Sequence, residues 1–248
     1  MRILIVHNRR RSLLPSGENR VVDQESAALA HAGHVVERFE RSSDDTDAST
    51  FAQKATLAGK SVWNRQTVAD VSEVVARFRP DVVHVHNVFP MISPSVLVAC
   101  RKEHVPAVVT FHNYAQVCAR GMLYRSEAPC FECLGHLPLP ALKHRCYQGS
   151  MVATVPRAVA LLAQRKTWRA LPSAYVFLSG SQKGLFSSLQ LPPERCFVKG
   201  NLAPPVGTEA AHRNRVVYAG RLHEVKGLRL LMRAWDAFLE RDPGNEHR

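Results

Sequence analysis

The 248-residue sequence lacks the signatures of several protein classes. No apolar run approaches the roughly 20 residues that a membrane-spanning helix needs. Residues 1–7 contain only a short apolar run and precede three arginines, which is too short and in the wrong charge order for a secretory signal. Glycine (13) and cysteine (6) are too sparse for a collagen-like chain or a disulfide scaffold. With 46% hydrophobic and 22% charged residues, the composition instead predicts a soluble, cytoplasmic globular protein.

The charge is unbalanced towards basic residues. The sequence has 33 Lys and Arg against 21 Asp and Glu, a formal net charge of +12. Such a surface attracts phosphate groups, whether on nucleic acid, anionic lipid or a nucleotide. The basic residues form short clusters and no long tract, so a generally solvated basic face is the alternative interpretation.

Short apolar runs of β-favouring residues alternate along the chain with helical patterns. The strands are expected at residues 2–7, 34–39, 81–86, 106–111, 174–178 and 196–199. The helices are expected at residues 18–32, 68–79, 93–104, 156–171 and 182–189. This alternation predicts an α/β fold with a doubly wound, Rossmann-like parallel sheet. In such sheets ligands bind at the carboxyl ends of the strands.

Composition divides the chain into two parts. Residues 1–201 form the first domain, with a Cys-rich insert at 114–150, and residues 202–215 are a linker rich in Pro, Gly and polar residues. Beyond it, a strand at 216–219 and a helix at about 227–240 make one βα unit. A segment of that size is too small to bury its own core. We therefore expect 216–248 to be the start of a truncated second domain.

Gly17 lies in the loop between the first strand and the first helix. A glycine there lets the backbone approach a phosphate, and the helix start adds N–H donors and a favourable dipole. The full G-x-G-x-x-G pattern is missing, so a plain turn is the alternative.

Three histidines lie at or after the ends of expected strands. His84 and His86 close the third strand and share one side of it, and His112 directly follows the fourth. A neutral imidazole could hold a hydroxyl group and its cation a phosphate. The alternative is that they are structural histidines with satisfied hydrogen bonds.

Four cysteines have the spacing C-x11-C-x2-C-x12-C: Cys118, Cys130, Cys133 and Cys146. A C-x2-C pair directs two thiolates at one ion, and two more thiolates complete a tetrahedral site. Without a secretory signal, a structural zinc or iron–sulfur site is favoured over disulfides, with reduced structural thiols as the alternative. Four protein ligands leave no position open for catalysis.

Arg221 and Lys226 follow the strand of the second part and lie inside a loop that begins with Gly220 and ends with Gly227. Arg binds phosphate bidentately and Lys binds as a point charge, so the pair could clamp a diphosphate. A solvated βα loop is the alternative.

The expected helix at 156–171 combines basic and apolar residues, among them Arg157, Arg165 and Leu162. A basic amphipathic helix can lie on anionic lipid, which predicts peripheral contact with the cytoplasmic face of a membrane. The alternative is a core-packed helix with a solvated basic face.

Taken together, these segments resemble the family 4 glycosyltransferases, enzymes with two facing Rossmann-like domains (the GT-B fold). Five stretches carry the match in chain order: Ser16-Gly17-Glu18 with the helix up to residue 35, residues 79–87, residues 110–150, residues 198–201, and residues 218–222 with Lys226-Gly227. The resemblance covers nearly the whole chain.

The resemblance implies a retaining transfer of a sugar from a UDP-, GDP- or ADP-sugar donor to a sugar or lipid-linked acceptor, in glycan or glycolipid synthesis and without a catalytic metal or cofactor. It implies that the first domain mainly holds the acceptor and the second holds the donor. By position, Gly17 would line the phosphate side of the cleft and His112 would face the reacting sugar. Arg221 and Lys226 would neutralise the departing diphosphate, which can contribute several kcal/mol in a dry site.

The sequence also departs from the family pattern. Ser16 stands where the family usually has a second glycine, Gly200 where it has proline and Gly180 where it has glutamate. The family's E-x7-E donor-binding segment, which lies farther along the second domain, is absent. We therefore expect the isolated chain to be weak or inactive as a transferase.

Two other functions compete with a transferase. One is a catalytically impaired acceptor-binding remnant. The other is a basic, zinc-containing nucleic-acid-binding protein, for which aromatic residues near the cysteines, such as Tyr114 and Phe131, could stack on bases. The five matching stretches favour the transferase, so no nucleic-acid partner is expected.

Overall fold

The computed structural model describes residues 1–10, 16–46, 50–202, 217–220, 222 and 224–241. The chain divides into two compact units. The first contains Met1–Leu123 and Phe131–Leu202, and the second contains Tyr124–Cys130 and Ala203–Arg248. The predicted linker at 202–215 lies almost entirely outside the described residues, so the predicted domain boundaries stay a prediction.

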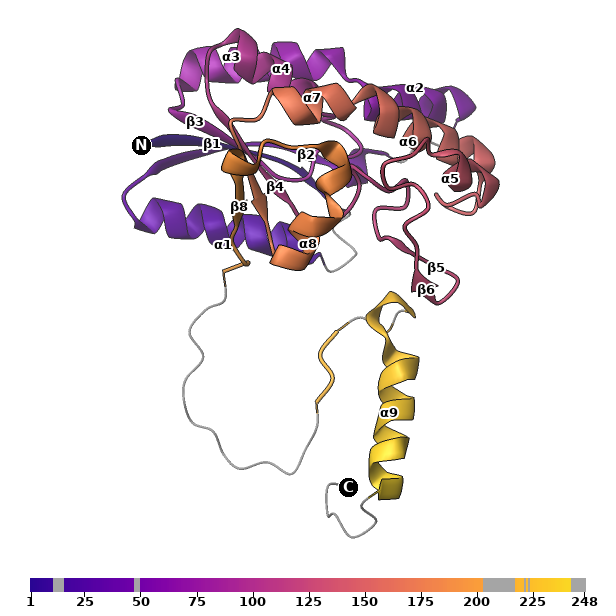
Figure 1. Ribbon diagram of the computed structural model, residues 1–248. Coiled ribbons are helices and arrows are strands. Elements are labelled where there is room, and N and C mark those ends of the chain that lie inside the picture. Colours follow the sequence, from indigo (N-terminus) through magenta and orange to yellow (C-terminus); the bar gives the residue numbers. More distant parts are fainter. Residues whose placement is uncertain (11–15, 47–49, 203–216, 221, 223, 242–248) are drawn as a thin grey trace. The chain divides into compact units, whose positions relative to one another are not determined.

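The first unit is built on a six-stranded sheet in the order β2-β1-β3-β4-β7-β8, in which every pair of neighbouring strands is parallel (Figure 1). Its strands are β1 (Arg2–Arg9), β2 (Val35–Ser42), β3 (Val82–Val85), β4 (Ala107–Phe111), β7 (Ala174–Phe177) and β8 (Cys196–Val198). All six expected strands of this unit are therefore present. The predicted Rossmann-like parallel sheet is confirmed.

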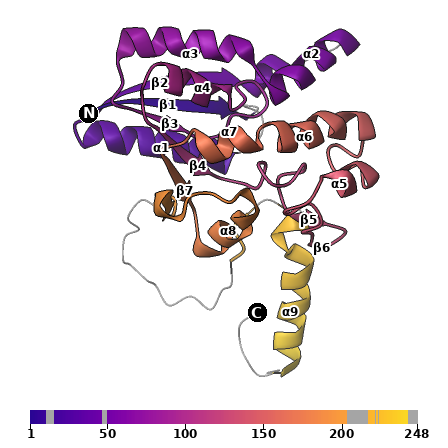
Figure 2. The same cartoon turned by 45° about the horizontal axis from the view of Figure 1, so that its top comes forward.

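Helices cover both faces of this sheet (Figures 1 and 2). One face carries α3 (Arg65–Phe78), α4 (Ser95–Lys102) and α7 (Arg165–Ala170), and the other carries α1 (Gly17–His31). Remaining helices of the unit are α2 (Phe51–Val62), α5 (Leu139–Lys143), α6 (Met151–Ala163) and α8 (Gly180–Leu185). The sheet is doubly wound, as predicted.

The alternation of side chains along the strands explains the two layers. Leu4 and Val6 of β1 belong to the larger core, which includes side chains from α3 and α4. Ile3 and Ile5 point to the other face and pack with Val22 of α1. Because successive residues of a strand face opposite sides, a strand that is apolar at every position is buried on both faces.

Two helical segments differ from the sequence prediction. Helix α2 was not expected, although Thr50 and Gln53 form a capping box at its start. The single helix expected at 156–171 is wrong, since α6 begins at Met151 and gives way to α7 at Gln164. The buried Gln164 amide donates to the carbonyls of Ser61 and Val62 at the end of α2, at 3.1 and 2.7 Å, and this contact fixes the junction.

The second unit contains a short antiparallel hairpin of β5 (Tyr124–Arg125) and β6 (Ala128–Pro129), a 3-10 turn (Glu224–Lys226) and α9 (Leu228–Arg241). The expected helix is present, but the expected strand at 216–219 is not formed by its described residues 217–219. A strand requires a neighbour for its backbone hydrogen bonds, and no strand pairs with these three residues.

Within the described part of the chain, no helix is long and apolar enough to cross a membrane.

Candidate functional site

Three adjacent strands of the sheet lead into the same dipeptide. His-Asn occurs at residues 7–8 in the last part of β1, at 86–87 after β3 and at 112–113 after β4. Because β1, β3 and β4 are parallel neighbours, the three pairs lie at one edge of the sheet. We call His7, His84, His86 and His112 the histidine edge. It occupies the carboxyl end of the strands, where doubly wound sheets bind ligands.

The four imidazole rings contact one another around His86. The ring centre of His86 lies 4.2 Å from that of His84 and 5.2 Å from that of His112, with which it stacks. Its Nδ1 lies 2.8 Å from Nε2 of His112, so one of these two nitrogens donates a proton to the other. His7 meets His86 edge-on at 6.3 Å. The histidines are thus one connected cluster.

Burial keeps these imidazoles neutral. His7 and His86 are 0% and 2% exposed. Desolvation is the largest influence on all four and lowers the pKa of His7, His86 and His112 below the ordinary value and that of His84 to about 4. A neutral imidazole has one donor and one acceptor nitrogen. The histidine edge is therefore suited to pair with hydroxyl groups at neutral pH.

The asparagines that follow the histidines connect the surrounding loops. The backbone N–H of Asn8 donates to the backbone carbonyl of Asn87 at 2.6 Å, and the side-chain amide of Asn87 donates back to the backbone carbonyl of Asn8 at 3.2 Å. Asn113 donates to Oε1 of Glu18 at 2.7 Å. Since Glu18 lies in the first turn of α1, this bond brings the start of α1 beside the end of β4.

The same bond brings two of the predicted site residues to one region. Gly17 immediately precedes Glu18, and His112 immediately precedes Asn113. Ser16 caps α1 by accepting from the Asn19 N–H at 3.3 Å. Among the described residues, no atom lies within 4 Å of a Cβ added to Gly17, so the described surroundings leave room for a ligand beside this backbone. The phosphate-binding role of Gly17 and the catalytic role of His112 stay predictions.

The other two predicted phosphate ligands belong to the second unit. Lys226 is exposed in the 3-10 turn of the second unit, and Arg221 lies outside the described residues. Their roles also stay predictions.

A buried carboxylate was missed by the sequence analysis. Glu25 of α1 is 8% exposed, and its Oε1 lies 3.5 Å from Nδ1 of His84 and 3.1 Å from Nζ of Lys199. It shares the buried face of α1 with Val22. A charged residue at helical spacing from an apolar one was the available signal, since charges are rarely buried without a partner. His7 was missed too, although it follows the same strand-end rule as His86.

The predicted metal ligands Cys118, Cys130, Cys133 and Cys146 are partly buried thiols. Cys118, Cys133 and Cys146 each belong to a backbone-hydrogen-bonded turn of the first unit, whereas Cys130 belongs to the second unit. In the described parts of the chain, the group of three or more ligand-type side chains within 4.8 Å of one another is Glu25, His84 and His86, not these cysteines. Metal binding by the cysteines stays a prediction.

The predicted basic face of the membrane-contact helix is wrong at Arg157. This side chain is 6% exposed, donates to the carbonyls of Ala119 and Ala115 at 3.2 and 3.1 Å, and lies over the Phe89 ring. The exposed side of α6 is instead apolar, with Met151, Val152, Val155, Val159 and Leu162. Peripheral membrane contact stays a prediction.

A comparison with protein-family models matches residues 15–198 to Glycosyltransferase Family 4. The match covers most of the chain and includes three members of the histidine edge, His84, His86 and His112. The chain belongs to glycosyltransferase family 4.

Solved structures resemble the chain more distantly. The UDP-GlcNAc 2-epimerase of Neisseria meningitidis bound to UDP-GlcNAc is 12% identical, with a TM-score of 0.45 over 81% of this chain and 46% of its own. The UDP-GlcNAc 2-epimerase of Methanocaldococcus jannaschii is 11% identical, with a TM-score of 0.44 over the same shares. Glycyrrhiza uralensis UGT73P12, complexed with glycyrrhetinic acid 3-O-monoglucuronide, is 11% identical, with a TM-score of 0.38 over 80% of this chain and 42% of its own.

The chain thus spans less than half the length of these structures. No curated protein matches it.

Proposed function

We propose that the chain is the acceptor-binding domain, with part of the donor-binding domain, of a retaining glycosyltransferase that moves a sugar from a nucleotide-sugar donor to a sugar or lipid-linked acceptor. The observation that supports this most is the histidine edge, which lies at the ligand-binding edge of a family 4 domain. Its imidazoles are desolvated and neutral, so each can both donate to and accept from a sugar hydroxyl.

In the proposed reaction, the bond between the anomeric carbon and the diphosphate oxygen breaks, and a bond to the acceptor oxygen forms. The departing diphosphate oxygen takes the electron pair of the broken bond, and the proton of the acceptor hydroxyl passes to that oxygen. His112 contacts the reacting sugar, and the backbone at Gly17 lies on the phosphate side. Arg221 and Lys226 neutralise the diphosphate as its charge develops, the kind of interaction that most effectively lowers such barriers.

Thermal unfolding of the chain with UDP-, GDP- and ADP-sugars and with free saccharides tests the proposal. A ligand at 100 times its Kd stabilises the folded chain by about 2.7 kcal/mol, which is visible as a raised midpoint. We expect one nucleotide class to raise the midpoint, His112→Ala to reduce the shift, and Lys226→Ala to reduce it for nucleotides only. His31→Ala is the matched control, because His31 is exposed at the end of α1.

The outcomes separate the two halves of the proposal. Stabilisation by saccharides alone would support the acceptor side and reject the donor roles of Arg221 and Lys226. A folded chain that no nucleotide sugar and no saccharide stabilises would overturn the proposal.

A further inference from the structure

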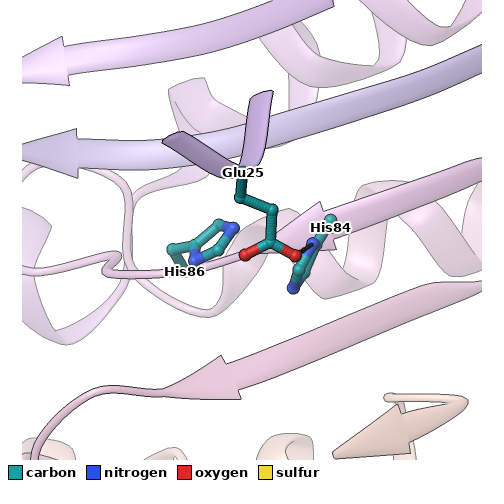
Figure 3. Close-up of side chains that lie close together, drawn as sticks. All are labelled: Glu25, His84 and His86. Carbon is teal, nitrogen blue, oxygen red and sulfur yellow. Dashed lines mark ion pairs between the residues drawn. The ribbon is translucent and has the colours of Figure 1, made fainter. Parts of the chain in front are cut away.

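Glu25 converges with two members of the histidine edge, His84 and His86. Glu25 comes from α1 and His84 and His86 from β3, and one potential ligand atom from each lies within 4.8 Å of the others. Figure 3 shows the carboxylate of Glu25 between the two imidazole rings. Two imidazoles and one carboxylate are a donor set that binds divalent transition metals.

The rings are held by outer contacts that leave a nitrogen available on each. Nε2 of His84 lies 2.8 Å from the hydroxyl of Thr110, and Nδ1 of His86 lies 2.8 Å from His112. This leaves Nδ1 of His84, which faces Glu25 at 3.5 Å, and Nε2 of His86. The latter is buried and has no hydrogen-bond partner in the described ranges. Histidine ligands of metals are typically oriented through their second nitrogen in this way.

Burial favours the neutral, metal-binding form of the two imidazoles. A metal ion requires a neutral imidazole and an ionised carboxylate. Burial lowers the pKa of His84 to about 4 and that of His86 well below its ordinary value, so both rings offer lone pairs at neutral pH.

Lys199 is the competing partner of the carboxylate. Its Nζ lies 3.1 Å from Oε1 of Glu25, but its side chain is 51% exposed whereas that of Glu25 is 11% exposed. The ammonium group can therefore withdraw into solvent and yield its position to an ion. A cation and the Lys199 ammonium compete for the same oxygen.

We propose that Glu25, His84 and His86 bind one divalent transition-metal ion of the zinc class. In a tetrahedral zinc site the donor atoms lie about 3.3 Å apart. The ligand atoms of the three side chains lie within 4.8 Å of one another, so each distance between them shortens by up to roughly 1.5 Å when the ion binds. Three protein ligands leave a fourth position for an oxygen ligand such as a hydroxyl, carboxylate or phosphate. The proposal does not depend on the transferase function.

Metal binding has a consequence for His112. A His86 that ligates through Nε2 donates its Nδ1–H to Nε2 of His112, because the metal occupies its other lone pair. The proton of His112 is then held on Nδ1. The ion would thus fix the tautomer of the predicted catalytic histidine.

Cobalt(II) is a suitable probe because its visible spectrum reports its ligands. The test uses the full chain with Cys133→Ser, which disrupts the separate cysteine set, after thermal unfolding has shown that this variant is folded. We expect one equivalent of cobalt(II) with four-coordinate d–d bands and no thiolate charge-transfer absorption, and displacement by zinc. Glu25→Gln and His84→Asn should each lower the affinity at least 100-fold, more than the roughly 10- to 100-fold of an outer contact.

Lys199→Met supplies a test that leaves every buried ligand intact. Removing the competing ammonium should raise the cobalt affinity by up to about fivefold, the range of an exposed ion pair. An exposed lysine elsewhere, Lys102→Met, should leave it unchanged. The proposal is overturned if the chain binds no cobalt(II) or zinc, if Glu25→Gln binds as tightly as its parent, or if Lys199→Met and Lys102→Met behave alike.

Discussion

The histidine edge and the Cys-rich stretch at 114–150 both gather ligand-type side chains, but they hold them in different ways. The histidines are carried by three parallel strands whose register fixes which residues meet. The four cysteines lie in turns and irregular segments, outside the short strands β5 and β6 and the helix α5. The hydrogen bonds of the sheet hold the histidines in position without a bound ligand. The positions of the cysteines instead depend on local contacts within the turn-rich stretch. A site built on regular strands can therefore be predicted from the sequence more readily than a site built on turns.

The largest expected effect compares a cysteine of the core with those of the Cys-rich stretch. Cys100 of α4 is 1% exposed, and burial raises the pKa of its thiol to about 12. Since the thiolate is the nucleophile, Cys100 should react with iodoacetamide at pH 8 at least about 10³-fold more slowly than Cys118, Cys130, Cys133 and Cys146. Peptide mass spectrometry after chelator treatment measures the rates.

Repeating the labelling in the presence of zinc tests the predicted metal site. If the four cysteines bind metal, zinc should slow their labelling and leave Cys100 unchanged. Labelling rates within tenfold of one another would contradict the difference in burial, and labelling that zinc does not alter would contradict the predicted metal site.

The next-largest effect is on stability and concerns the cluster of aromatic side chains around Phe111. Phe111, the residue before His112, is 1% exposed and its ring contacts those of Trp168, Tyr175, Phe177 and Phe186. Phe111→Ala should cost about 3–5 kcal/mol of unfolding free energy. Phe131→Ala, at a 49% exposed ring in the Cys-rich stretch, should cost less than about 0.5 kcal/mol. Similar losses in urea unfolding would show that the stretch is as tightly packed as the sheet.

Arg157 joins the Cys-rich stretch to α6, and its removal should have a smaller effect. Arg157→Ala leaves the carbonyls of Ala115 and Ala119 without a donor in a buried site, which should cost about 2 kcal/mol. Arg169→Ala is the control, because the Arg169 side chain is exposed and donates to the side chain of Gln190 at the surface. Equal stabilities of the two variants in urea would contradict the structural role of Arg157.

The smallest effect is pH-dependent. The Tyr175 hydroxyl is buried and donates to the Trp168 and Arg169 carbonyls at 2.8 and 2.9 Å, so Tyr175→Phe should cost about 1–2 kcal/mol at pH 7. Burial raises the pKa of Tyr175 to about 12, whereas an unfolded tyrosine ionises near about 10. The stability contributed by this group is therefore lost as the pH rises between these values. The gap between parent and variant should narrow there, and a constant gap would contradict the assignment.

The contrast between the regular sheet and the turn-rich stretch also explains which features the sequence could predict. The inner strands of the sheet are short apolar runs, which made them recognisable in the sequence. The rule that ligands bind at the carboxyl ends of such strands pointed to His84, His86 and His112. Helix α2 was missed because Ala, Gly and Lys blur its apolar face, so only its capping box was visible. Glu25 was missed because pairing between α1 and β3 is a tertiary contact. The strand expected at 216–219 is not formed by its described residues 217–219, because β-favouring residues without a neighbouring strand do not form one.

The central claim is that the histidine edge, and not the Cys-rich stretch, is the ligand-binding site. Histidine side-chain NMR signals, assigned by single substitutions and followed during titration with the nucleotide sugar or saccharide that stabilises the chain, test it most directly. We predict that the signals of His84, His86 and His112 shift while those of His136 and His144 in the Cys-rich stretch do not. Shifts confined to His136 and His144 would contradict the claim.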